Sequence, residues 1–196
     1  MSHEEIRVII VVYLAVFLPL IIYFKNKNKL PYWTPTFYII GIVVCALGWE
    51  IWFTYGWIDG DSVDIRRSEA LNIWLPKNAN WLMNSMGDAG TVLLGGLWLM
   101  WISHGKDTIV FKKWKWSAFG VLLFWCIGQN ILVEMFLYHD QLADGKPLSW
   151  APLSPLGPYF NPILFEFNDR TIMLQSQMPW IILPWFFYRT LINFNK

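Results

Sequence analysis

The sequence predicts an all-α integral membrane protein, built as one five-helix transmembrane domain over residues 1–196. Three observations predict this class. Hydrophobic residues make up 56% of the chain and charged residues only 15%, whereas a typical soluble domain has roughly 45–50% and about 25%. Five apolar stretches are long enough to cross a hydrocarbon layer about 30 Å thick. Between these stretches, basic and acidic segments alternate along the chain.

Each predicted span is an apolar run of about 20 residues or more, the length that an α-helix needs to cross a bilayer. The spans are predicted over residues 6–24, 35–57, 79–103, 114–138 and 171–194. Pro19, Pro179 and Pro184 fall inside spans, where membrane helices tolerate proline better than soluble helices do. A membrane β-barrel is disfavoured because its strands read as alternating segments of about ten residues, and these runs are continuous.

The charges between the spans predict the orientation. Basic residues gather after the first span, after the third span and in the C-terminal tail: Lys25, Lys27, Lys29, Lys106, Lys112, Lys113, Lys115, Arg189 and Lys196. The positive-inside tendency then places the N-terminus outside and the C-terminus in the cytoplasm. We expect a multi-pass protein of a bacterial inner membrane or of the endoplasmic reticulum. The net charge of +1 argues against nucleic-acid binding, which needs a basic excess.

Three carboxylates lie inside the predicted spans, where each costs about 2.5–3.5 kcal/mol and therefore needs a reason. They are Glu50, Asp88 and Glu134, and their positions put all three in the outer half of the bilayer. Further polar or aromatic residues are expected at the same level: Gln177, Asn84, Thr91, Asn130, Trp49, Trp52 and Trp180. Together they predict a polar, aromatic-walled pocket. Two plainer interpretations stay open: amides and hydroxyls can simply bridge helices, and Glu134 is shallow enough for interfacial water to solvate it.

Such a pocket favours acid-initiated carbocation chemistry. A carboxylic acid buried among apolar groups stays protonated near neutral pH and can protonate a carbon–carbon double bond or an epoxide. A tryptophan face can stabilise the resulting cation without attacking it. We therefore expect isomerisation or cyclisation of a sterol or isoprenoid lipid, a hydrophobic small molecule that reaches the pocket from the membrane bilayer. No cofactor and no metal are expected, since the histidines are not paired at metal-ligand spacing within a span.

Short motifs in the spans resemble a known family. The run Leu47-Gly48-Trp49-Glu50-Ile51-Trp52-Phe53 resembles the second-span motif of the emopamil-binding protein (EXPERA) family, whose founding members are sterol Δ8–Δ7 isomerases. Asp88-Ala89-Gly90-Thr91 is similar to that family's third-span acid motif, and the run from Gln177 to Pro184 resembles its last-span motif. The resemblance implies that Glu50 and Asp88 are the catalytic acids and that Trp180 stabilises the cation. Ala46 stands where the family has a histidine.

Other functions stay open at this point. Membrane-bound terpene cyclases also place a Trp-Glu pair in a span, so the enzyme expected here is an isomerase or a cyclase. The same pocket would serve a non-catalytic lipid- or sterol-binding protein. The chain could also be a small structural subunit of a larger membrane complex, and a homo-oligomer is left open.

Overall fold

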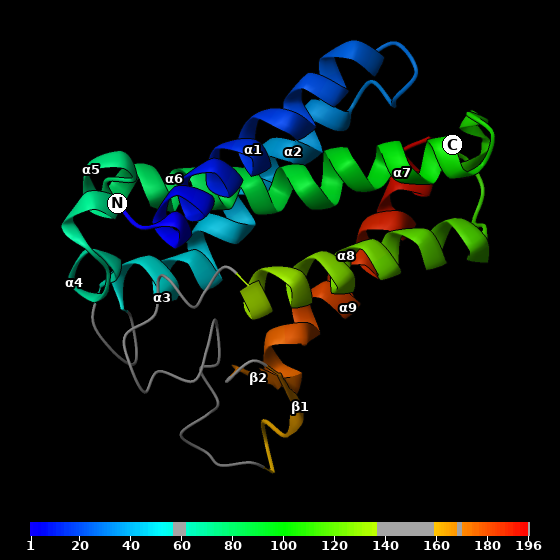
Figure 1. The fold of residues 1–196 in the computed structure, drawn as a ribbon. Coiled ribbons are helices and arrows are strands. Elements are labelled where there is room, and N and C mark those ends of the chain that lie inside the picture. The colour runs from blue at the N-terminus through cyan, green and yellow to red at the C-terminus, as the bar shows by residue number, and fades with distance from the viewer. Residues whose placement is uncertain (57–61, 137–158, 168–169, 196) are drawn as a thin grey trace.

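The computed structural model describes residues 1–56, 62–136, 159–167 and 170–195, and they are mostly helical (Figure 1). The helices and strands follow one another in this order: α1 (His3–Asn26), α2 (Thr34–Leu47), α3 (Trp49–Tyr55), α4 (Val63–Arg66), α5 (Glu69–Trp74), α6 (Lys77–Ala89), the π-helix η1 (Gly90–Gly95), α7 (Gly96–Ser103), the 3-10 helix η2 (Thr108–Phe111), α8 (Trp116–Phe136), β1 (Ile163–Phe167), β2 (Arg170–Met173) and α9 (Leu174–Phe194).

The helix α1 begins at a capping box. The amide of Glu5 donates to the Ser2 hydroxyl at 3.2 Å, and the amide of Ser2 donates to the Glu5 carboxylate at 2.6 Å. These two bonds satisfy amide groups that the first turn of a helix leaves unpaired. The helix packs on α6 and η1. Its outer face carries large apolar side chains that stay exposed, among them Phe17 and Phe24.

The second predicted span is broken at Gly48. The helices α2 and α3 meet there at an angle of 48°, and the Gly48 amide donates to the Val44 carbonyl at 2.9 Å. A Cβ atom added to Gly48 would lie 2.7 Å from that carbonyl oxygen, so the close approach requires glycine. Because of this break, α3 packs on α6. Trp49 then reaches Asp88 of α6, and Glu50 reaches Asn84 one turn earlier in the same helix.

The third predicted span is one continuous helical rod whose middle part is π-helical, with α-helix on both sides. The segments α6, η1 and α7 run end to end, and Gly90, Gly95 and Gly96 at the two junctions keep right-handed helical backbone (Figure 1). The π-helical segment packs against α1, α2 and α8. The indole of Trp125 on α8 donates to the Thr91 carbonyl at 2.9 Å. This rod is therefore the central element of the bundle.

The last two long helices, α8 and α9, pack on each other. The prediction of helix from residue 171 is wrong at its start: an antiparallel hairpin of β1 and β2 precedes α9, which begins at Leu174. The side chain of Asn161 accepts a bond from the Gln175 amide at 2.9 Å and so holds the hairpin to the first turn of α9. The predicted span ends at residues 57 and 138 lie outside the described residues.

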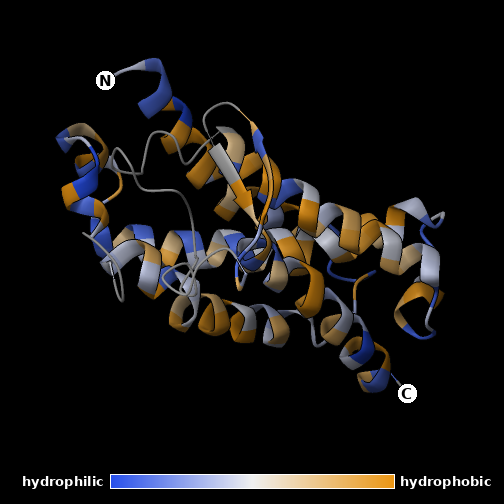
Figure 2. Ribbon diagram, turned by 90° about the horizontal axis from the view of Figure 1, so that it is seen from below, coloured by the Kyte–Doolittle hydropathy of each residue, from blue (hydrophilic) through white to orange (hydrophobic). Residues whose placement is uncertain are grey.

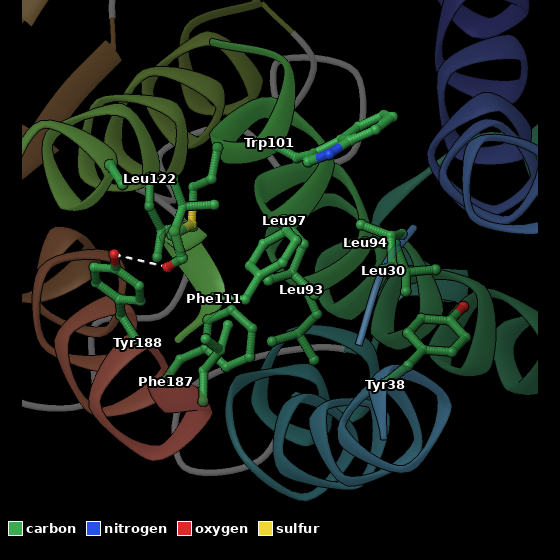
Figure 3. Close-up of a cluster of buried hydrophobic side chains, with 14 of the residues drawn as sticks. Leu30, Tyr38, Leu93, Leu94, Leu97, Trp101, Phe111, Leu122, Phe187 and Tyr188 are labelled. Carbon is green, nitrogen blue, oxygen red and sulfur yellow. Dashed lines mark hydrogen bonds between the residues drawn. The ribbon is translucent and has the colours of Figure 1, made fainter. Parts of the chain in front are cut away.

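A large apolar cluster joins α2, η1, α7, α8 and α9. Figure 3 shows part of it, with Leu93 and Leu97 between Tyr38 on one side and Phe187 on the other. Tyr188 closes the cluster near the loop before α8, where its hydroxyl donates to the Val110 carbonyl at 2.9 Å. At the far end of α9, the rings of Phe194 and Phe37 meet edge to face at 5.3 Å. The first turn of α2 and the C-terminus therefore lie at the same end of the bundle.

Two helices, α1 and α8, are long and apolar enough to cross a membrane, and the bent pair α2–α3 is a third candidate. Along the helices, hydrophobic residues dominate the middle parts, and many hydrophilic ones gather near the ends (Figure 2). The structure thus confirms a mainly helical chain with apolar helices of membrane-spanning character. The number of spans and the orientation of the termini stay predictions.

Candidate functional site

The centre of the candidate site is a contact between three residues from three helices. The indole Nε1 of Trp49 on α3 donates to the Oδ2 atom of Asp88 on α6 at 2.6 Å. The ring of Trp49 also meets the ring of Trp180 on α9, with centroids 5.6 Å apart and planes inclined by 52°. A short bond to a carboxyl oxygen fixes the orientation of the Trp49 ring, whose Nε1 edge lies at the acid and which packs on the ring of Trp180.

Glu50 points to the turn of α6 that precedes Asp88. Its carboxyl accepts bonds from the Asn84 amide at 3.3 Å and from the Thr54 hydroxyl at 3.3 Å, and the residue is 1% exposed. Asn84 and Asp88 are four residues apart, so they occupy one face of the helix. Two consecutive residues of α3 therefore bind two consecutive turns of α6. The break at Gly48 is what allows this pairing, since it lets α3 follow α6 for its whole length.

A cavity of about 200 Å³ opens beside Asp88, between α2, the rod of α6 and η1, and α9. Among the described residues that line it, Asp88 and Thr190 interrupt an otherwise apolar surface, and Asp88 alone carries a carboxyl group. The lining residues are Phe37, Ile40, Gly41, Val44, Cys45, Trp49, Asp88, Ala89, Val92, Leu93, Pro179, Trp180, Leu183, Pro184, Phe186, Phe187 and Thr190. Ile40, Leu183 and Phe186 are themselves exposed on the outer surface of the bundle. The cavity therefore reaches the side of the molecule that apolar residues cover.

A second, smaller cavity of about 30 Å³ shares Asp88 and the two tryptophans with the first. Its other walls are largely polar: Asn130 and Glu134 of α8, and Ser176 of α9. This volume is large enough for one or two water molecules, given the polar partners around it. Asp88 thus lies between an apolar chamber and a polar one, with Trp49 and Trp180 forming the wall that both share.

The polar chamber is held by a bond between α8 and α9. The Gln177 amide donates to the Glu134 carboxyl at 2.9 Å, and both residues are buried. The Gln177 Oε1 atom and the Asn130 Nδ2 atom are buried without a hydrogen-bond partner among the described residues. Buried polar groups are rarely left unpaired, so these two atoms mark a place where a polar ligand atom or water fits.

The structure does not bring all the predicted residues to one cavity. Asp88, Trp49, Trp180, Asn130 and Glu134 line the two chambers, and Gln177 joins them through Glu134. Glu50 and Asn84 bind each other behind the wall and line neither chamber.

Two predicted residues lie elsewhere. Trp52 packs on Phe53 and Val63, towards the α4 segment. Thr91 faces a different groove, which lies between α1, η1 and α8 and is lined mainly by apolar side chains. Thr91 is therefore in neither chamber beside Asp88.

Sequence reasoning missed several residues of the site, including Gln129 in the polar chamber and Thr190 in the apolar cavity. Thr54 binds Glu50 from four positions further along α3, a spacing that the sequence displays. Ser176 lines the polar chamber, and only its place next to Gln177 could have indicated it. Among the described residues, no group of three His, Cys, Asp or Glu side chains is placed to hold a metal ion. The polar side chains gathered at the site carry carboxyl, amide, hydroxyl and indole groups.

Comparison of the chain with protein families, with curated proteins and with solved structures finds no match.

Proposed function

We propose that the protein is a membrane-embedded isomerase or cyclase of a sterol or isoprenoid lipid, and that it works through acid-initiated carbocation chemistry. The observation that carries this proposal is the apolar cavity whose described lining holds one carboxyl group, Asp88. That carboxyl accepts a hydrogen bond from the Trp49 indole, and the ring of Trp49 meets the ring of Trp180 in the same lining. A lipid hydrocarbon fits the apolar walls. An aromatic face beside an acid is what a transient carbocation needs.

The proposed setting is a chain that crosses the membrane five times, with its N-terminus outside and its C-terminus in the cytoplasm. Five helical units support it: α1, the bent pair α2–α3, the rod from α6 to α7, α8 and α9. The segments rich in lysine follow α1 and α7, and contacts at Phe37 and Tyr188 bring them to the end of the bundle where α9 ends. In this setting the apolar cavity opens towards lipid, so a substrate would arrive from the bilayer.

The proposed reaction begins with proton transfer from the Asp88 carboxyl to one carbon of a double bond. A new C–H bond forms there, the Asp88 O–H bond breaks, and the neighbouring carbon becomes cationic. The faces of Trp49 and Trp180 stabilise this cation through their quadrupoles. Loss of a proton from another adjacent carbon moves the double bond and returns the proton to the site. Attack on the cation by a second double bond of the same molecule, before that loss, would give a ring instead.

The other polar residues take supporting roles in this proposal. Glu134 lines the polar chamber beside Asp88, and its carboxyl can receive or return the proton. Gln177 positions that carboxyl through its hydrogen bond. Glu50 is a positioning residue, since it reaches neither chamber and fixes α3 on α6 through Asn84. This differs from the role that the resemblance to the emopamil-binding protein family implies for Glu50. The family assignment itself stays a proposal that rests on the motifs in the sequence.

The test is product analysis in heavy water. Purified protein is incubated in D2O with a membrane lipid extract that contains sterols and isoprenoid alkenes, and products are separated by mass spectrometry. Proton transfer from an exchangeable acid places deuterium on carbon, so the product should carry it. Asp88→Asn keeps a side-chain oxygen for Trp49 and should lower turnover at least about 100-fold.

The control variant is Glu69→Gln, which removes an exposed acid in the first turn of α5 and should leave turnover unchanged. Full turnover in Asp88→Asn would overturn the proposed acid. Binding of lipid without any conversion would favour the alternative of a lipid-binding protein.

A further inference from the structure

A second feature concerns the basic end of the bundle. The guanidinium of Arg189 near the end of α9 lies 4.6 Å from the centre of the Trp114 ring and 5.6 Å from that of Trp185. Aromatic faces attract a cation and restrict its motion. The faces of the guanidinium are thus engaged by rings, whereas its N–H groups make no hydrogen bond or ion pair within the described part of the chain.

Tyr188, the residue before Arg189 in α9, holds the loop before α8 in place. The Tyr188 hydroxyl donates to carbonyls of Val110, at 2.9 Å, and Lys113, at 3.2 Å, and it accepts from the Lys115 amide at 3.1 Å. The ring of Tyr188 stacks on that of Trp114 with centroids 4.6 Å apart. These contacts hold the lysine-rich loop beside Arg189.

We call Lys112, Lys113, Lys115 and Arg189 the basic cluster. No carboxylate of the described residues forms an ion pair with any of them. Asp107, the acid of the same loop, uses its carboxylate to accept from the Ile109 amide at 2.9 Å. Four cations are therefore gathered without an ion-pair partner among the described residues, and the arginine among them lies over two aromatic rings.

Apolar side chains border the basic cluster on the outside of the bundle. Trp116 is 71% exposed, Phe186 is 55% exposed and Trp185 is 41% exposed. Exposed tryptophans beside basic residues are typical of the level at which lipid headgroups meet hydrocarbon. A ligand of this surface would thus place an anionic group on the cations and apolar chains along α8 and α9.

We propose that the basic cluster binds the phosphate headgroup of an anionic phospholipid, with Arg189 as its anchor. The planar fork of a guanidinium matches two phosphate oxygens, and stacking orders it in advance so that little freedom is lost on binding. The lysines add long-range attraction for a lipid with net negative charge. This proposal requires only that the chain lies in a bilayer, and it is independent of the chemistry at Asp88.

The experiment measures binding of phosphatidylglycerol to the full-length protein in neutral detergent by native mass spectrometry. Phosphatidylcholine has the same phosphate without net charge, and inorganic phosphate has the charge without the chains. Wild-type protein should bind phosphatidylglycerol at least about tenfold more tightly than either probe. Equal binding of phosphatidylcholine, or displacement of the lipid by millimolar inorganic phosphate, would overturn the proposal.

Matched triple variants locate the site. Substituting Lys112, Lys113 and Arg189 by glutamine should weaken phosphatidylglycerol binding about 100-fold, at about fivefold for each charge removed. The same substitutions at Lys25, Lys27 and Lys29 remove equal charge from the loop after α1 and should weaken binding less than about fivefold. If both variants lose affinity equally, or neither loses any, the site is not the basic cluster.

Two further variants cover other outcomes. The double variant Lys112→Gln/Lys113→Gln leaves the Arg189 stack intact, and it should still weaken binding about 20-fold if the triple variant does not fold. Arg189→Lys keeps the positive charge but replaces the planar guanidinium, which can bind two phosphate oxygens at once. This variant should bind phosphatidylglycerol at least about threefold more weakly. Unchanged affinity in Arg189→Lys would show that Arg189 is not the anchor.

Discussion

Replacing Gly48 by alanine tests how α3 is positioned. The added Cβ would lie 2.7 Å from the Val44 carbonyl oxygen, closer than real Cβ contacts. That oxygen belongs to the backbone of α2, so it cannot move aside as a flexible side chain would. Forcing an extra methyl group into such a contact costs about 1–3 kcal/mol. For a chain of 196 residues, a loss of about 2 kcal/mol lowers Tm by about 4–8 °C.

The assay is thermal unfolding of the purified protein in detergent, with Gly128→Ala as the matched control. A Cβ added to Gly128 meets no atom within 4 Å, and alanine favours a helix interior over glycine by about 1 kcal/mol. The control should therefore hold or raise Tm. A Gly48→Ala protein as stable as wild type would show that the close contact at the α2–α3 break does not limit the fold.

The same variant tests whether the break sets the position of Trp49. Trp49→Phe removes the bond to Asp88, which contributes about 1–3 kcal/mol where the partner is a carboxyl group. If Gly48→Ala displaces α3, this bond is already weakened, and Trp49→Phe should cost less in the alanine background than alone. Fully additive losses of stability would refute the link between the break and the site.

Three other perturbations have defined outcomes. Tyr188→Phe removes a buried hydroxyl with several partners and should lower stability by about 1–3 kcal/mol in thermal unfolding; an unchanged Tm would contradict its role in fastening the loop. A double-mutant cycle of Glu134→Leu and Gln177→Leu should give a coupling of about 0.6–1.7 kcal/mol, and zero coupling would deny the bond between α8 and α9. A hydrogen bond from Ser62, with Lys77, lowers the pKa of Asp64 below its ordinary value of 3.8. Its stabilising contribution is present above that value and is lost as pH falls below about 4, so Tm should fall less on acidification in Asp64→Asn than in wild type.

The sequence predicts the helical class and the grouping of polar residues because both depend on local composition. Long apolar runs appear in the chain as such, and the depth of an acid follows from its distance to the end of a run. In the structure, Asp88, Glu134 and Gln177 meet around two joined chambers, as residues at one depth can.

The structure differs from the sequence-based prediction where tertiary contacts, and not local composition, decide the backbone. Glycines are frequent in membrane helices, so nothing distinguishes Gly48, where the chain bends, from Gly128, where it does not. Thr91 is expected at the level of the acids, but it belongs to the π-helical segment and lines a different groove from Asp88. The hairpin before α9 depends on pairing between two short strands. Ile, Phe and Thr residues at 163–173 favour strands, but the prediction assigns the apolar run from residue 171 to the last span as a whole.

The π-helical segment has a consequence for which changes of length this chain can tolerate. A π turn accommodates an extra residue in a helix. Deleting one residue between Gly90 and Gly95 would remove the extra residue and restore regular winding with little rotation of α7. Deleting one residue from the regular turns of α6 would instead rotate α7 by about 100° relative to the start of α6, and side chains such as Trp98 and Trp101 would face different neighbours. The chain should therefore tolerate a change of length within η1 better than one within α6.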